Sequence, residues 1–568
     1  MPDEGDRRPT FGLWVRRHGL GVGLLLVLVY LVVFPLAQIQ ILALEDGGRA
    51  YQEALEVPGI GTTLVTTALL GVGSLIISVV LGTALAWFAQ RLPRRAAWLA
   101  VVPVLPVVLP AVAVVVGWAF LLSPTVGYIN IFLRALPFVD VEVPAVGMPS
   151  GPLNIYTVPG IIFVTGLQMV PLIFLFVQSS LRQLNFETIE SASVAGASPM
   201  RAFFSVVIPS LRPALVYSTA FALLLGLGQL TAPQFLGVRD GIRVLATEVY
   251  RFGGQDPTDF PVAAAVASPL LIAGVVFIIA QRLLLRRDFR FVSVGLKGAS
   301  RPIKPSRLAV PVIATYGIFT LVLPFAAIIF VSLQVYWTGM VDFATLTFDN
   351  YVKAFETTAI TDALWTSIWT SLVAMAIALP LGYLVAELLY RRRGSGVVRA
   401  IVDVLVQIPL GIPAVVFGVS FLYTYLGNPF LLYGNPILIV LVYIVLVLPF
   451  SVRMQLTARL ALGSAFEDAA RAAGASPLRA HVTVLVPMMR GSLAGASVLM
   501  FVILTHEFAA SLFVRSTTTQ VLGTLLYQQW VYATYPMVAV MSIIMSAVTA
   551  VGLIIAVSVG GRTVLDRL

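Results

Sequence analysis

Twelve long apolar runs divide this chain, and each is long enough to cross the hydrocarbon core of a bilayer as a helix. Only 11% of the 568 residues are charged, against roughly a quarter in an ordinary soluble domain. The sequence therefore predicts an all-α polytopic membrane protein of about twelve spans. The expected spans lie near residues 20–44, 61–89, 100–122, 158–180, 211–236 and 261–285, and then near 308–333, 364–390, 400–426, 437–456, 491–513 and 537–560.

The basic residues predict the orientation of these spans. With the N-terminus placed inside, 29 of the 36 lysines and arginines fall in cytoplasmic segments or adjoining helix ends. This bias predicts that both termini are cytoplasmic, and it explains the net charge of +10 without a nucleic-acid partner. The first run follows a short basic leader, but it is too long for a signal peptide and no small-residue cleavage site follows it, so we expect a permanent span.

Two eight-residue segments, 195–202 and 473–480, are identical except at one position. In each, a serine stands directly before a proline, which suits an N-cap followed by the first position of a helix. The glycine two residues before that serine suits the left-handed residue that closes a preceding helix. Each copy therefore predicts a helix, a glycine turn and a second short helix. The residues concerned are Gly196, Ser198 and Pro199 in the first copy, and Gly474, Ser476 and Pro477 in the second.

The two halves of the chain share more than these segments. Pro171 matches Pro449 at the same 278-residue offset, and Gly82 matches Gly382 within corresponding runs. Because each half has an even number of spans, we expect a parallel repeat about an axis along the membrane normal. The predicted organisation is a first permease-like domain at 1–285 with a repeat loop at about 187–209, a cytoplasmic basic linker at 286–307 that is solvated or binds membrane lipid, and a second domain at 308–568 with a repeat loop at about 465–487.

Several kinds of chemistry lack the residues they need. The chain has no cysteine and three scattered histidines, so neither a catalytic residue set nor a built-in metal centre is expected. The phosphate-binding string Gly-x4-Gly-Lys-Ser/Thr does not occur in the sequence, which predicts no cofactor on this chain and no ATPase site of its own. Any energy from ATP would then come through another polypeptide.

Ionisable residues inside spans are functional candidates because burying them in a membrane is costly. Glu507 lies within the eleventh run beside His506, and Gln229 occupies the matching position of the first half. These three residues are candidates for a translocation pathway, with a structural hydrogen bond inside the helix bundle as the alternative. Asp403 and Glu387 lie near cytoplasmic ends, where they can reach water.

The repeated segments carry a recognisable pattern: Glu-Ala-Ala, three residues, glycine, nine residues, and then hydrophobic, any residue, hydrophobic, proline. This pattern resembles the cytoplasmic EAA loop of permeases from binding-protein-dependent ABC importers, and the resemblance extends over nearly the whole chain. The acid of the pattern is Glu190 in the first copy and Asp468 in the second. The aspartate is shorter than the usual glutamate, and the neighbouring Glu467 is a candidate to compensate.

The resemblance implies two ATP-binding cassette subunits at the cytoplasmic face, with ATP bound there, and an external binding protein that is periplasmic or lipid-anchored. The residues implied in coupling to the ATPases are the six turn residues above together with Glu190, Arg201, Asp468 and Arg479. The implied location is a bacterial or archaeal cytoplasmic membrane.

Two shorter stretches, 153–157 and 241–250, resemble the iron(III)-transporter branch of these permeases and imply ferric iron as the substrate. Thiamine, phosphonate, a polyamine or an oxyanion are alternatives within the same machinery. A twelve-span secondary transporter is the alternative class; it would need its own ion-coupling residues.

Overall fold

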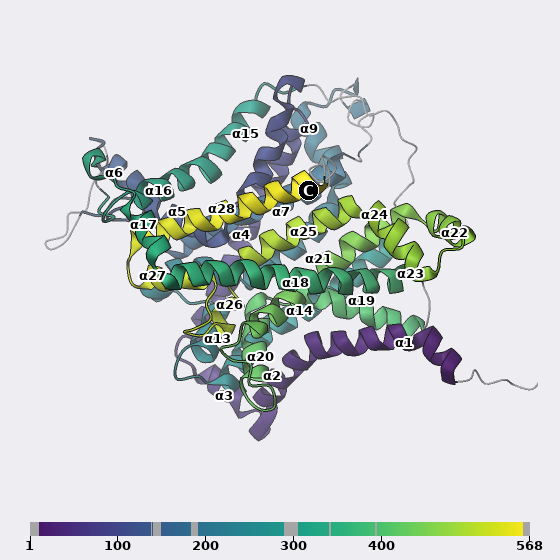
Figure 1. The fold of residues 1–568 in the computed structure, drawn as a ribbon. Helices are drawn as coiled ribbons and strands as arrows, with labels where there is room; N and C mark the ends of the chain where they lie inside the picture. The colour runs from purple at the N-terminus through teal and green to yellow at the C-terminus, as the bar shows by residue number, and fades with distance from the viewer. Residues whose placement is uncertain are drawn as a thin grey trace, which may run out of the picture. The chain divides into compact units, whose positions relative to one another are not determined.

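The computed structural model describes residues 11–137, 139, 149–182, 184, 191–192, 194–288, 305–339, 342–391 and 395–560. All regular elements in these residues are helices (Figure 1). Nine helices in this part of the chain are long and apolar enough to cross a membrane, and three bent pairs raise the number to twelve when each pair counts as one span. The predicted all-α polytopic architecture is therefore confirmed.

Two of the predicted runs, 100–122 and 400–426, bend sharply instead of forming one straight helix. The bends lie at Pro110 and Pro413, and the residue before each proline has an extended backbone, with ψ near 130°. A proline ring clashes with a helical residue before it, so the helix must end there. The first pair is η3 (Arg94–Val108) with α5 (Ala111–Leu122), bent by 93°, and the second is α19 (Gly396–Gly411) with α20 (Ala414–Leu426), bent by 107°.

In the described ranges, four helical segments contain a single widened π-turn, and each is followed by a proline. In the first, the N–H of Phe34 bonds to the carbonyl of Val29 five residues back, and Pro35 comes next. Because proline has no N–H, it leaves a carbonyl without its usual helical partner, and a π-turn relieves that mismatch. The prolines that end the repeated pattern, Pro209 and Pro487, therefore each widen the helical turn that precedes them. The turns are η1 (Val29–Val33), η4 (Phe203–Val207), η6 (Ile318–Val322) and η8 (His481–Leu485).

Contacts divide the chain into two compact units, the larger of which contains residues 50–361 and 522–546. Its most extensive packing joins α4 (Ile60–Ala89) to α7 (Val158–Leu181). A Cβ atom at Gly82 would lie 2.7 Å from the Cβ of Ile173, so the glycine lets these helices approach closely. The other helices are α3 (Arg49–Glu56), α6 (Tyr128–Arg134), α9 (Pro199–Ala202), α10 (Ile208–Ser210), α11 (Arg212–Leu227), α12 (Thr231–Leu236), α13 (Leu245–Gly254), α14 (Phe260–Asp288), α15 (Ala309–Gly317), α16 (Leu323–Ser332), α17 (Asp349–Glu356) and α27 (Leu522–Val531), with the short turns η5 (Val238–Asp240) and η7 (Phe343–Thr345).

The second unit contains residues 1–49, 362–521 and 547–568. Here Ser451 donates a hydrogen bond to the carbonyl of Ala378 (2.8 Å) and Gln455 donates to that of Leu379 (3.0 Å), which joins α21 (Pro436–Leu462) to α18 (Thr358–Arg391) beside Gly382. The helices are α1 (Phe11–Leu28), α2 (Phe34–Leu44), α21 (Pro436–Leu462), α22 (Ala465–Ala472), α23 (Pro477–Ala480), α24 (Val486–Met488), α25 (Arg490–Thr505) and α26 (Ser511–Val514), with the turn η2 (Glu45–Gly47); α18 (Thr358–Arg391) and α28 (Tyr535–Gly560) contribute residues to both units.

The compact units differ from the predicted domains 1–285 and 308–568 in where the first helix of each half belongs, and in residues 522–546, which belong to the larger unit. Helices α1 and α2 pack on α19 and α20, as Figure 1 shows for α2 beside α20, whereas α15 and α16 pack on η3 and α5. Trp118 of α5 is fully buried, and its ring centroid lies 4.9 Å from that of Phe319 in η6. Each first helix is thus packed with the bent span of the opposite sequence half. Of the predicted linker, residues 289–304 lie outside the described residues.

Candidate coupling site

The second repeat loop (465–487) forms the predicted helix, turn and short helix. Gly474 has φ +87°, and the N–H of Ala475 bonds to the carbonyl of Ala470 (3.0 Å), which closes α22 through a left-handed residue. The Ser476 hydroxyl then accepts a hydrogen bond from the N–H of Arg479 (3.3 Å) and caps α23. The local turn chemistry is therefore as predicted.

The first repeat loop (187–209) has the same turn where the structure describes it. Gly196 also has φ +87°, the N–H of Ala197 bonds to the carbonyl of Ala192 (2.9 Å), and Ser198 caps the helix that begins at Pro199. Glu190 lies outside the described residues. The two copies of the repeated sequence thus adopt the same backbone turn.

The charged residues of these loops divide into exposed and buried groups. Arg201, Asp468 and Arg479 are exposed and available to a partner protein. Glu467 is buried, with 6% of its surface exposed, although it neighbours Asp468 in α22. The suggestion that Glu467 compensates for the shorter Asp468 is wrong, because its carboxylate faces the interior and is held by two arginines.

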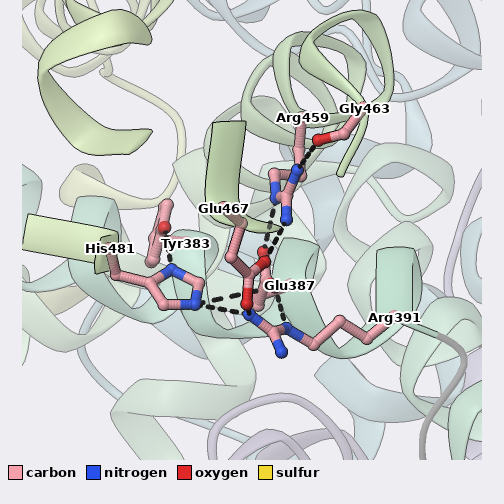
Figure 2. Close-up of polar contacts among 7 residues, drawn as sticks. All are labelled: Tyr383, Glu387, Arg391, Arg459, Gly463, Glu467 and His481. Atoms are coloured by element: carbon pink, nitrogen blue, oxygen red, sulfur yellow. Dashed lines mark hydrogen bonds and ion pairs between the residues drawn. The ribbon is translucent and has the colours of Figure 1, made fainter. Parts of the chain in front are cut away.

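Figure 2 shows the buried surroundings of Glu467, which we name the charged cluster: Glu387 and Arg391 from α18, Arg459 from α21, Glu467 from α22, and the adjoining Tyr383 and His481. Arg459 is 1% exposed; its guanidinium donates to Glu387 (3.0 Å) and to Glu467 (2.8 Å). Arg391 also donates to both carboxylates, at 2.5 Å to Glu467. The two acids and two arginines therefore form a closed ring of four ion pairs.

Further contacts fix the Arg459 side chain within this ring. A third hydrogen bond runs from its guanidinium to the backbone carbonyl of Gly463, at the end of α21. The same guanidinium lies 4.0 Å from the ring centroid of Tyr390, a cation–π contact. Arg459 thus connects α18, α21 and the start of the second repeat loop.

Both imidazole nitrogens of His481 are hydrogen-bonded, Nε2 to the ring and Nδ1 to Tyr383. Arg391 donates to Nε2 of His481 (2.6 Å), and because a guanidinium cannot accept a hydrogen bond, this nitrogen must be unprotonated. Nδ1 then carries the proton and donates to the Tyr383 hydroxyl (2.5 Å). His481 is therefore a neutral imidazole in a defined tautomer.

Glu387, Glu467 and His481 are also the set of described residues whose ligand atoms lie close enough together to hold a metal ion. This arrangement does not fit one. Both carboxylates already bond to two guanidinium groups, and a cation placed among them would meet Arg391 and Arg459. The set is an ion-paired structural element.

Sequence reasoning missed the charged cluster. Glu387 was expected to reach water near a cytoplasmic helix end, but it is only partly exposed and pairs with two arginines. One local signal was present, since Glu387 and Arg391 are four residues apart, a spacing that favours an ion pair on a helix. Nothing local indicated that Arg459 and Glu467 complete the ring from 72 and 80 positions away.

The pathway candidates make defined local contacts. Both oxygens of Glu507 accept backbone N–H groups, from Ala510 (2.7 Å) and Ser511 (2.8 Å), and the Ser511 hydroxyl donates to it as well. This carboxylate therefore closes the turn between α25 and α26. His506 bonds to Thr549 through Nε2 (2.9 Å).

Gln229 belongs to the other compact unit and follows α11. Its side-chain amide donates to Gln168 of α7 (3.2 Å), and Gln168 in turn donates to the carbonyl of Ala111 (3.0 Å). The two residues that match in the repeat therefore use their polar groups in different local networks.

Replacing Glu507 with glutamine is expected to lower the thermal stability of the protein. A glutamine would point its NH₂ group at a backbone N–H of the turn, and leaving a buried donor unpaired costs about 1–3 kcal/mol. Thermal unfolding in detergent would measure this loss, with Ser511→Ala as a milder control that removes only the hydroxyl. Normal stability combined with slow transport would instead support the pathway role.

Comparison with known proteins gives one family. Its model, described as a binding-protein-dependent transport system inner membrane component, matches residues 78–289 and again residues 378–564. The two matches place one repeat in each half of the chain and include both repeat loops.

Individual relatives agree with this assignment. The ferric transport system permease protein FbpB of Actinobacillus pleuropneumoniae is 25% identical over 518 residues, covering 89% of this chain and 72% of that protein. A putative ferric transport system permease protein, FbpB 1 of Haemophilus influenzae, is 25% identical over 516 residues, covering 88% and 78%. The sulfate transport system permease protein CysT of Escherichia coli is 27% identical over 275 residues, covering 48% and 93%. This chain belongs to the family of binding-protein-dependent transport system inner membrane components.

Proposed function

We propose that this chain is the membrane permease of an ABC importer in which two separate ATPase subunits bind the two repeat loops. The observation that carries the proposal is the duplicated helix-turn-helix, with Gly196 and Gly474 at the same φ of +87°. Each copy presents an exposed arginine, Arg201 or Arg479, on its short helix. The sequence contains no phosphate-binding string of its own, so ATP would act through partners that dock on these loops.

The proposed transport cycle follows from this arrangement. ATP binding would draw the two ATPases together and move both repeat loops, and the membrane helices would then open the pathway to an external binding protein. In the proposed orientation both termini and both loops are cytoplasmic, which the distribution of 29 of 36 basic residues supports.

The proposed substrate is ferric iron. Two relatives named for ferric transport align with about nine-tenths of this chain, whereas the relative named for sulfate transport aligns over 93% of its own length with about half of this chain. An oxyanion is therefore the second candidate. Because the external protein would select the substrate, purifying that protein and identifying its bound ion would distinguish iron from sulfate.

Copurification tests whether the chain is an ABC importer permease or a secondary transporter. The chain, isolated from its native membrane in mild detergent, is expected to bring down an ATP-binding cassette subunit. Arg201→Glu with Arg479→Glu should release that subunit, because the exposed charges would then repel acidic partner residues. Arg95→Glu, which reverses another exposed arginine outside the repeat loops, serves as the matched control. Retention of the ATPase by the double variant would contradict the docking role, and a parental chain that transports without any ATPase would favour a secondary transporter.

A further inference from the structure

The two halves hold their repeat loops by different chemistry, although the loops themselves share one backbone turn. At the 278-residue offset of the repeat, Arg459 corresponds to Leu181 and His481 to Phe203. At the offset that pairs Gly82 with Gly382, Glu387 corresponds to Trp87. Every one of these charged or polar members of the cluster therefore has an apolar counterpart in the first half.

The apolar counterparts also meet in space. The ring centroids of Trp87 and Phe203 lie 5.1 Å apart, at the place where the second half brings Glu387 beside His481. Arg91, the counterpart of Arg391, lies 5.3 Å from the Trp87 ring centroid as a cation–π contact. Leu181 is completely buried in the surrounding apolar cluster. The contact that holds each repeat loop against the preceding helices thus has two forms. In the second half it is the charged cluster, and in the first half it is formed by Trp87, Arg91, Leu181 and Phe203, which we name the aromatic joint.

These two kinds of joint respond differently to a displacement. Ion pairs with several hydrogen bonds per group hold a fixed geometry, and a small shift leaves a buried charge unpaired. Apolar contacts are not directional, so aromatic and aliphatic groups can slide past one another and remain buried. The charged cluster should therefore resist a motion that the aromatic joint permits.

We propose that the charged cluster is a rigid joint that makes the second repeat loop move together with α18 and α21, whereas the first repeat loop slides over α4 on its aromatic joint. The proposal rests on the proposed function, since it concerns how the docked ATPases act on the helices. Arg459, Glu387 and Glu467 are then positioning residues for coupling, and the two ATPases act on the permease unequally.

The sharpest variant gives the second half the residues of the first: Glu387→Trp, Arg459→Leu, Glu467→Ile and His481→Phe. Ile189 corresponds to Glu467, although it lies outside the described residues. The variant replaces both acids and Arg459 with apolar residues, so Arg391 is the one charge of the ring that remains, and we expect folding to be retained because this charge has an aromatic partner. Arg391 stays in place, where it can stack on the new tryptophan as Arg91 does on Trp87.

The variant would be reconstituted with its copurified ATPase and binding protein, and uptake of ferric iron and of sulfate would be measured beside ATP hydrolysis. We expect parental ATPase binding and thermal stability but about tenfold less uptake per ATP hydrolysed, within the usual range of coupling between sites. Parental uptake per ATP would overturn the proposal and leave the cluster a purely structural role. The parental complex tests the proposed function by itself, and only the comparison with the variant bears on the joint.

A second measurement uses the intact cluster. The chain has no cysteine, so spin labels attach only at introduced positions. One pair of labels, at Leu460→Cys and Thr483→Cys, spans the charged cluster. The matched pair, at Arg182→Cys and Ser205→Cys, spans the aromatic joint. All four sites are exposed. On ATP binding the first distance should stay constant while the second changes. Equal behaviour of the two pairs, whether both change or neither does, would overturn the proposal.

Discussion

Replacing Arg459 with alanine is expected to lower the free energy of unfolding by about 3–5 kcal/mol, because it removes one of the two arginines that pair with the largely buried carboxylates of Glu387 and Glu467. The side chain is 1% exposed and bonds to Glu387, Glu467 and the Gly463 carbonyl. Arg391 alone would face both acids. Thermal and denaturant unfolding in detergent would measure the loss.

Arg453 provides a matched control on the same helix. It pairs with Asp403 at 2.8 Å, but both side chains are about one-third exposed or more. An exposed ion pair contributes about 0–1 kcal/mol, so Arg453→Ala should change stability little. If the two alanine variants unfolded at the same midpoint, the charged cluster would not stabilise this unit.

Replacing Gly474 with valine is expected to separate ATP hydrolysis from transport. A valine at φ +87° is strained by about 1–3 kcal/mol, and the strain is relieved by changing the turn that orients α23. No other heavy atom lies within 4 Å of a Cβ placed there, so the effect would come from the backbone and not from a clash. The reconstituted complex should hydrolyse ATP while uptake falls about fivefold or more.

Two comparisons sharpen this result. Gly196→Val carries the same backbone strain in the other loop and should have the same direction of effect. Gly427→Val adds the same side chain at a position with φ −99° and open space around the new Cβ. Because valine is unstrained there, this variant should leave uptake unchanged. Normal uptake by both loop variants would refute the coupling role of the glycine turns.

The repeat loops could be predicted closely because their structure is local. Ser476 caps a helix that begins one residue later, and Gly474 closes one that ends two residues earlier. The prolines were informative in the same way, although Pro110 and Pro413 bend their spans where one straight helix was expected. Each of these features depends on neighbouring backbone groups.

The charged cluster could not be predicted by the same reasoning. Its members are separated by up to 98 positions, and their types are equally compatible with solvated helix ends. Glu467 and Asp468 are adjacent acids, yet only Glu467 turns inward. The choice depends on which face of α22 turns toward Arg391 and Arg459, and that is a property of the assembled unit.

The sequence by itself determined that the chain is helical, how it repeats, and where its two glycine turns lie, because apolar length, caps and backbone preferences act over a few residues. Only the tertiary structure decided that α1 packs with α19 and α15 with η3, and that one repeat loop is held by ion pairs and the other by aromatic rings. A uniformly apolar helix carries little information about its partner. Steric fit and charge pairing between distant segments make that selection.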